Sequence, residues 1–74
     1  MLGFTSSPRW TALATEGEVV LAVRNQSAVR LRLELPGGRP RMFLDDDHLV
    51  VWDDLGRLVV AELVHGDIVC DLRI

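Results

Sequence analysis

The sequence predicts an all-β protein built from two four-stranded antiparallel meanders that repeat with period 39, the spacing from Gly17 to Gly56. Three observations support this fold class. Short runs of β-branched and aromatic residues alternate with turn residues along the whole chain. Gly17 and Gly56 stand at corresponding turns. Apolar and polar residues alternate in the same phase near the end of each half. A single small β-barrel or a β-sandwich is the alternative arrangement.

The second half contains the clearest hairpin. The run His48–Trp52 is apolar and rich in β-formers, and an Asp-Asp pair stops it. Gly56 then stands where a three-to-five-residue loop needs a residue with positive φ, so a new strand is expected to start at Arg57. Leu58 to Val64 is apolar with one exception, which predicts a strand covered on both faces.

A further strand is expected after the break at His65-Gly66-Asp67. Its residues alternate, and we expect a buried face formed by Ile68, Cys70, Leu72 and Ile74, opposite a more polar face formed by Val69, Asp71 and Arg73. The chain has one cysteine, so it cannot form an internal disulfide. We therefore interpret Cys70 as a core thiol rather than a reactive one.

The first half repeats this layout. Without a gap, residues 10–35 fall on residues 49–74, so that Trp10–Ala14 corresponds to the run that ends at Trp52. Phe4 falls on Phe43, and each unit is expected to begin with a short fourth strand near Leu2–Thr5 or Arg41–Leu44. The alternation also keeps its phase, with Val29, Leu31, Leu33 and Leu35 falling on Ile68, Cys70, Leu72 and Ile74.

Sequence identity between the halves is low. The identical pairs are Gly17/Gly56, Val20/Val59, Ala22/Ala61 and Leu33/Leu72. Two unrelated hairpins with the same β rhythm would be the alternative to a duplication. We favour a duplication because turns, phase and period agree. The chain is then one small domain over residues 1–74, with residues 1–36 as the first unit, 37–40 as the connection and 41–74 as the second unit.

A resemblance to known proteins lies in the segment from Leu49 to Val60, Leu-Val-Val-Trp-Asp-Asp-Leu-Gly-Arg-Leu-Val-Val, with Gly66-Asp67-Ile68-Val69 after it. It resembles blades of WD40-like and related bacterial β-propellers, of the kind that accompany MoxR-type ATPases and von Willebrand factor A domains. Neither unit has the Gly-His pair or the terminal Trp-Asp of a standard WD40 blade. The resemblance therefore implies a fold and no functional residue. A period near 40 with four strands is also blade-sized.

Composition and charge indicate a module that needs a partner. Of the 74 residues, 49% are apolar, more than one sheet of this size can cover, so a protein partner or self-association is expected. Residues 1–41 hold six Arg and three Glu, a charge of +3, whereas residues 42–74 hold two Arg and eight acids, a charge of −6. The opposite signs favour contacts between unlike halves of two copies.

Other classes of partner are less consistent with the sequence. The arginines of the first half do not alternate with aromatic residues, which argues against nucleic acid. The connection has adjacent glycines but lacks the Gly-Lys-Ser/Thr ending of a phosphate loop. No signal-peptide pattern or membrane-spanning apolar run is present, so we expect a cytoplasmic protein.

The expected function is that of a non-catalytic interaction or scaffold module. Two blades cannot close a ring, so the chain would complete one with copies of itself or a partner chain, or it would be a fragment of a longer propeller. No catalytic residue and no cofactor are expected. Turn residues at the strand ends are the expected contact residues: Arg39, Arg41, Asp45, Asp46, Asp47, His65 and Asp67.

The alternative function is a small metal-dependent binder or enzyme that uses one end of the second unit. In a four-stranded meander the first and third turns lie at the same end. Carboxylates and imidazoles from these turns could hold Ca²⁺, Mg²⁺ or Zn²⁺. The candidates are Asp45, Asp46, Asp47, His48, His65 and Asp67. Asp-rich turns without metal are common, and we regard metal binding as the weaker hypothesis.

Overall fold

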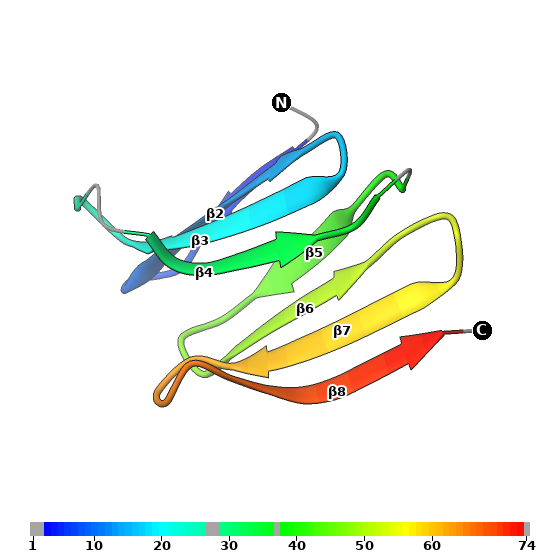
Figure 1. The fold of residues 1–74 in the computed structure, drawn as a ribbon. Coiled ribbons are helices and arrows are strands. Elements are labelled where there is room, and N and C mark those ends of the chain that lie inside the picture. Colours follow the sequence, from blue (N-terminus) through cyan, green and yellow to red (C-terminus); the bar gives the residue numbers. More distant parts are fainter. Residues whose placement is uncertain (1–2, 27–28, 37, 74) are drawn as a thin grey trace.

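The computed structural model describes residues 3–26, 29–36 and 38–73, and these residues form eight β-strands and no helix. The strands are β1 (Gly3–Ser6), β2 (Trp10–Thr15), β3 (Glu18–Val23), β4 (Val29–Glu34), β5 (Arg41–Leu44), β6 (His48–Trp52), β7 (Arg57–Glu62) and β8 (Asp67–Arg73). They build sheet 1, β1-β2-β3-β4, and sheet 2, β5-β6-β7-β8, each in chain order and antiparallel (Figure 1). The predicted fold class of two four-stranded meanders is confirmed.

The second hairpin of each sheet turns at the predicted glycine. Gly17 has a φ of 79° and Gly56 a φ of 88°, and both end the loop that precedes the third strand. A side chain would strain this left-handed backbone, which is why glycine stands there. The loops differ in length, however. Thr15 pairs directly with Glu18 across two residues, whereas the second loop has three residues, numbered 54–56, between Asp53 and Arg57.

This extra residue shifts the repeat within each unit. Leu13 pairs with Val20 in sheet 1, whereas Val51 pairs with Val59 in sheet 2. Strands β1 and β2 therefore correspond to β5 and β6 at an offset one shorter than the predicted period, and the ungapped alignment is wrong before the turn. Because side chains alternate between faces, the shift places Phe4 and Phe43 on non-equivalent faces.

After the turn, the two units correspond at the predicted period, and they share an irregularity in the pairing of their strands. A β-bulge breaks the pairing of β3 with β4 between Leu21 and Ala22, and another breaks the pairing of β7 with β8 between Val60 and Ala61. Both bulges lie at the same place in their sheets, one full period apart. Shared bulges of this kind support the interpretation of the chain as two equivalent units.

Each sheet has two faces, which we name by corresponding positions. The front face carries Ala12, Ala14, Val19, Leu21 and Leu33 in sheet 1 and Val50, Trp52, Leu58, Val60 and Leu72 in sheet 2. The back face carries Phe4, Leu13, Val20 and Ala22 in sheet 1 and Met42, Val51, Val59 and Ala61 in sheet 2.

The core lies between the front of sheet 1 and the back of sheet 2. Sheet 1 contributes Ala12, Ala14, Val19, Leu21, Leu33 and Leu35, and sheet 2 contributes Leu44, Leu49, Val51, Val59, Ala61 and Leu63. Non-equivalent faces therefore meet. The sheets stack front to back in the same order, and they do not form a sandwich in which two equivalent faces turn inward.

The gap between the sheets is tapered. Among the described strands, the backbones of the two sheets approach each other most closely where β1 and β2 face β5. On the front of sheet 1 at this side, Gly3 on β1 and Ala12 and Ala14 on β2 are small, whereas Trp10 lies at the end of β2, where its Nε1 donates to the Asp46 carbonyl. The small residues let the two sheets approach each other, since interiors are close-packed.

Two burial predictions for the second unit are wrong. Ile68 and Leu72 are 42% and 52% exposed, and Cys70 is partly exposed rather than a core thiol. Cys70 and Leu72 lie on the front of sheet 2, which faces away because sheet 2 buries its back against sheet 1. The bulge pairs Ile68 with Ala61 and so places it on the back, where it is exposed near the start of the edge strand β8. Strand β7 is likewise covered fully on its back only. Ile74 lies outside the described residues.

Candidate interaction surface

The front of sheet 2 is an open apolar face. It presents Phe43 on β5 and Trp52 on β6 at 56% and 37% exposure, and Leu72 on β8 at its far side. Between them lie partly buried apolar side chains, those of Val50, Leu58, Val60 and Cys70. Single exposed apolar residues are ordinary on protein surfaces, but a row that runs across all four strands is a contiguous patch. Such patches mark sites of interaction.

The back of sheet 1 is the second open face. Phe4 on β1 is 59% exposed and Leu13 on β2 is 37% exposed. Val20 and Ala22 on β3 continue the row and are partly buried. Toward β4 this face becomes polar, where Arg32 forms an ion pair with Glu18 at 3.3 Å. The molecule therefore has an apolar open face at each end of its two-sheet stack.

Polar contacts fix the two sheets to each other at the turn between β1 and β2. The Asp46 side chain accepts a hydrogen bond from the Arg9 backbone N–H at 3.2 Å, and the Asp46 carbonyl accepts one from Trp10 Nε1 at 3.2 Å. The sequence predicts that Asp46 contacts a partner or a metal, whereas here it contacts the other sheet of its own chain. No sequence pattern indicates the contact with Trp10.

Arg57 joins the sheets on the wide side of the gap. Its guanidinium donates to the Glu34 carbonyl of sheet 1 at 2.7 Å and to both carboxylate oxygens of Asp71 at 3.2 and 3.0 Å. These bonds with Asp71 raise the pKa of Arg57, against partial burial, and the guanidinium in turn lowers the pKa of Asp71. From the sequence, Arg57 is only the expected start of a strand.

The pair formed by Arg57 and Asp71 has a counterpart of reversed sign. Glu18 and Arg32 occupy the equivalent positions on the back of sheet 1, and they form an ion pair as well. The Arg57 side chain is 20% exposed, whereas the Arg32 side chain is 57% exposed. The covered pair therefore also bridges the sheets, while the open pair binds only within its own sheet.

The connection between the units is held by the loop after β6. The Arg39 backbone N–H donates to Asp54 Oδ1 at 2.8 Å, and Gly38 packs so closely on Asp53 that an added Cβ would collide with the Asp53 carboxylate. Gly38 is therefore required for space rather than for a turn. The predicted contact residue Arg39 uses its backbone inside the molecule, and its side chain is exposed.

At the other end of sheet 2, the aspartates stabilise their own turn. Asp45 Oδ1 accepts hydrogen bonds from the backbone N–H groups of Asp47 and His48 at 2.8 and 2.7 Å. These two bonds lower the pKa of the Asp45 carboxyl, against a smaller effect of desolvation. This is the common role of an aspartate at the start of a turn.

The neighbouring turn between β7 and β8 is organised in the same way around Glu62. Its carboxylate accepts from the backbone N–H groups of Val64 and His65 and pairs with His65 Nδ1 at 2.9 Å. Desolvation raises the pKa of Glu62, but the hydrogen bonds from His65 and Val64 outweigh it and the pKa is lowered. His65 thus pairs with a glutamate that is not among the predicted site residues.

The two turns do meet, as the meander predicts, because the Leu63 N–H donates to the Asp47 carbonyl at 2.9 Å. Within the part of the chain that the structure describes, no three His, Cys, Asp or Glu side chains gather in a group that could hold a metal ion. Asp67 begins β8 and pairs with Glu62, whereas Arg41 begins β5 and pairs with Trp52. The expected contact residues therefore divide between two ends of sheet 2.

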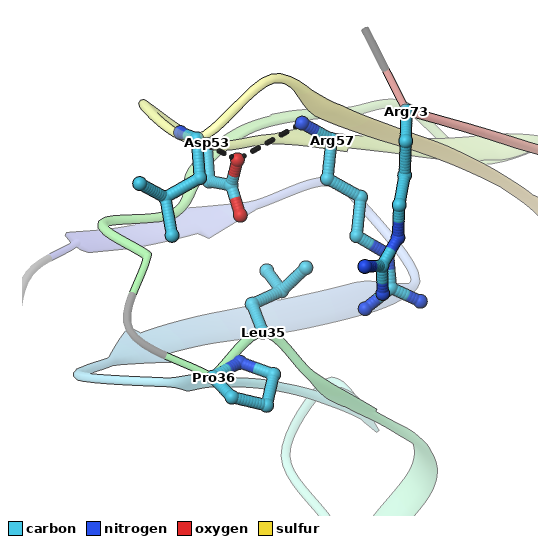
Figure 2. A pocket seen from close by; sticks show the side chains of 6 residues that line it. Leu35, Pro36, Asp53, Arg57 and Arg73 are labelled. Carbon is cyan, nitrogen blue, oxygen red and sulfur yellow. Dashed lines mark hydrogen bonds between the residues drawn. The ribbon is translucent and has the colours of Figure 1, made fainter.

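A pocket lies where the connection meets the wide side of the gap. Figure 2 shows its lining, with Leu35 and Pro36 from the segment after β4 opposite Arg57 and Arg73 from sheet 2. The Arg57 backbone N–H donates to Asp53 Oδ1 at 3.0 Å beside it. The volume of this pocket is about 70 Å³, well below the several hundred Å³ of a typical ligand site, and two larger hollows of about 280 and 490 Å³ are more open to solvent. The open faces are the more extensive candidate surface.

Comparison with known proteins finds no relative. No protein-family model matches the chain, and neither a curated protein nor a solved structure is significantly similar to it.

Within the described residues, no helix has the length and apolarity needed to span a bilayer.

Proposed function

We propose that this protein is a non-catalytic interaction module that stacks its two open sheet faces against neighbouring sheets, as blades do in a propeller. The observation that carries the proposal is the front-to-back arrangement of the sheets. It leaves apolar side chains on both ends of the stack, including Phe43 and Trp52 on one face and Phe4 and Leu13 on the other. A face-to-face sandwich would have turned its apolar faces inward.

The residues at the turns support a rigid frame rather than chemistry. Asp45 and Glu62 accept hydrogen bonds from their own turns, and Arg57 bridges the two sheets. An active site normally combines perturbed acids or bases with a pocket that can hold a substrate. The pocket beside Arg57 has a volume of about 70 Å³, and the larger hollows of about 280 and 490 Å³ are open to solvent, which favours presentation of surfaces over catalysis.

Sedimentation equilibrium of the chain, combined with fluorescence of a dye that binds apolar surfaces, tests the proposal. We expect the mass to rise with protein concentration, because each open face would be covered by another sheet. The midpoint of thermal unfolding should rise with it, since association stabilises only the folded chain. A monomer that unfolds cooperatively and leaves the dye dark at every concentration would contradict the proposal.

A further inference from the structure

We propose that the open front of sheet 2 binds the open back of sheet 1 on a second copy of this chain, head to tail. This inference rests on the proposed function and names its partner. It comes from the equivalence of faces within the chain. The open front of sheet 2 corresponds to the front of sheet 1, which is buried, and the open back of sheet 1 corresponds to the back of sheet 2, which is buried.

The operation that carries sheet 1 onto sheet 2 can therefore be applied once more. It would place a third sheet against the front of sheet 2 in the way that sheet 2 lies against sheet 1. Sheet 1 of another copy can take this place because its back is open and carries apolar side chains at several of the corresponding positions, such as Phe4 for Met42 and Leu13 for Val51. Val20 and Ala22 there match the buried Val59 and Ala61 in identity as well as position.

Aromatic residues would meet at the inner edge of this contact. Within the chain, β1 lies closest to β5. Between copies, β5 of one chain would accordingly lie beside β1 of the next, with Phe43 on the front of β5 and Phe4 on the back of β1. Both rings are more than half exposed in the single chain. Pairs of aromatic rings bring a large apolar area and prefer offset or edge-to-face contact.

Charge favours the same contact and disfavours contacts between like faces. Residues 1–36, which contain sheet 1, hold four Arg and three Glu, a charge of +1, whereas residues 41–74, which contain sheet 2, hold three Arg and eight acids, a charge of −5. A head-to-tail contact brings unlike halves together, whereas contact between two copies of sheet 2 brings two negative halves together. Head-to-tail contacts repeat until the rotation closes. With four to eight blades in a propeller, about two to four copies would close a ring.

Complementary variants test the inference. Phe4→Arg blocks the back of sheet 1, and Phe43→Arg blocks the front of sheet 2, while each variant keeps the other face intact. We expect each variant alone to be monomeric, with its association constant reduced at least about tenfold, because truncating a central anchor has effects of this size. An equimolar mixture should form a 1:1 dimer through the two intact faces. Leu55→Arg, in an exposed loop away from both faces, is the control and should assemble like the unchanged chain.

Native mass spectrometry and sedimentation of the mixture provide the readout, and circular dichroism confirms that each variant is folded. If a variant unfolds, Leu13→Arg and Leu72→Arg replace the pair on the same two faces. Dimerisation of the Phe4→Arg chain by itself would overturn the inference and leave the proposed function standing, because it would show contact between like faces. A monomeric unchanged chain that binds the apolar dye would also overturn the inference alone. A monomeric unchanged chain that leaves the dye dark would overturn both.

Discussion

The front of sheet 1 and the front of sheet 2 have the same place in their sheets and opposite surroundings. Leu33 and Leu72 are the same residue at equivalent positions, yet Leu33 is 9% exposed and Leu72 is 52% exposed. The back faces show the reverse, since Val59 is buried and its equivalent Val20 is only partly buried. Burial is thus determined by which neighbour a face receives, and a strand's own residues show only that the face is able to accept one.

The largest difference is expected between Leu33→Ala and Leu72→Ala. Removing a buried leucine side chain costs its transfer free energy and leaves a cavity, so Leu33→Ala should lower the unfolding free energy by about 2–5 kcal/mol. Leu72→Ala should change it by less than about 0.5 kcal/mol in the single chain. Urea unfolding at low protein concentration, followed by tryptophan fluorescence, measures both. Equal losses would mean that the two fronts are equally covered.

A second comparison concerns two glycines, Gly38 in the connection between the units and Gly3 on β1 at the narrow side of the gap. Gly38→Ala should lower the unfolding free energy by about 1–3 kcal/mol, because its Cβ would collide with the Asp53 carboxylate, which two backbone N–H groups hold in place. Gly3→Ala, whose Cβ would meet Met42 at an ordinary 3.8 Å, is the matched control. The same unfolding experiment applies, and a stable Gly38→Ala chain would show that the loop can yield.

The reversed ion pairs give a smaller expected effect. Arg57→Met removes the bond to the Glu34 carbonyl as well as the bonds to Asp71 and should lower the unfolding free energy by about 1 kcal/mol. The equivalent Glu18→Gln, on the open face, should have an effect below about 0.5 kcal/mol, because exposed pairs contribute little. Thermal unfolding of both variants at low and high salt distinguishes the covered pair from the screened one.

The smallest effect is expected from pH. The pKa values of Asp45, Glu62 and Asp71 are lowered in the folded chain. Groups with a lowered folded pKa stabilise the protein above their unfolded pKa, and this contribution is lost as pH falls through the folded pKa. Stability should therefore be constant from pH 7 to about 5 and decrease below about 4. Melting curves between pH 7 and 2 measure it, and Asp71→Asn should flatten the decrease slightly.

Local patterns predicted most of the fold. Turn residues with known conformational needs, such as Gly17 and Gly56, placed the hairpins, and the apolar alternation placed the strands between them. The one-residue difference between the loops was missed. The ungapped alignment matches the two units correctly after Gly17 and Gly56, and this match hides the shift of one residue before the turns. That single residue moved Phe4 and Phe43 to non-equivalent faces.

The candidate surface could be predicted only in part. Composition indicated that apolar surface would remain uncovered, but the position of that surface depends on how the sheets stack, which no strand encodes alone. Cys70 illustrates the limit, because its strand alternates like that of Leu31 and yet belongs to an open face. Asp46 illustrates a second limit. Its contact with Trp10 joins residues from separate units, and local sequence patterns do not indicate contacts between residues so far apart in the chain.

The taper of the gap has a consequence for the number of subunits. When sheets stack in the same orientation, the stack curves by the angle between successive sheets. That angle depends on how closely the sheets approach at the narrow side of the gap, where β1 and β2 face β5. Within the chain, Gly3 beside Met42 keeps the two sheets close together at this side. Larger side chains at this side would widen the gap and straighten the stack, so a closed ring would need more subunits. A perfectly straight stack would grow into a fibre.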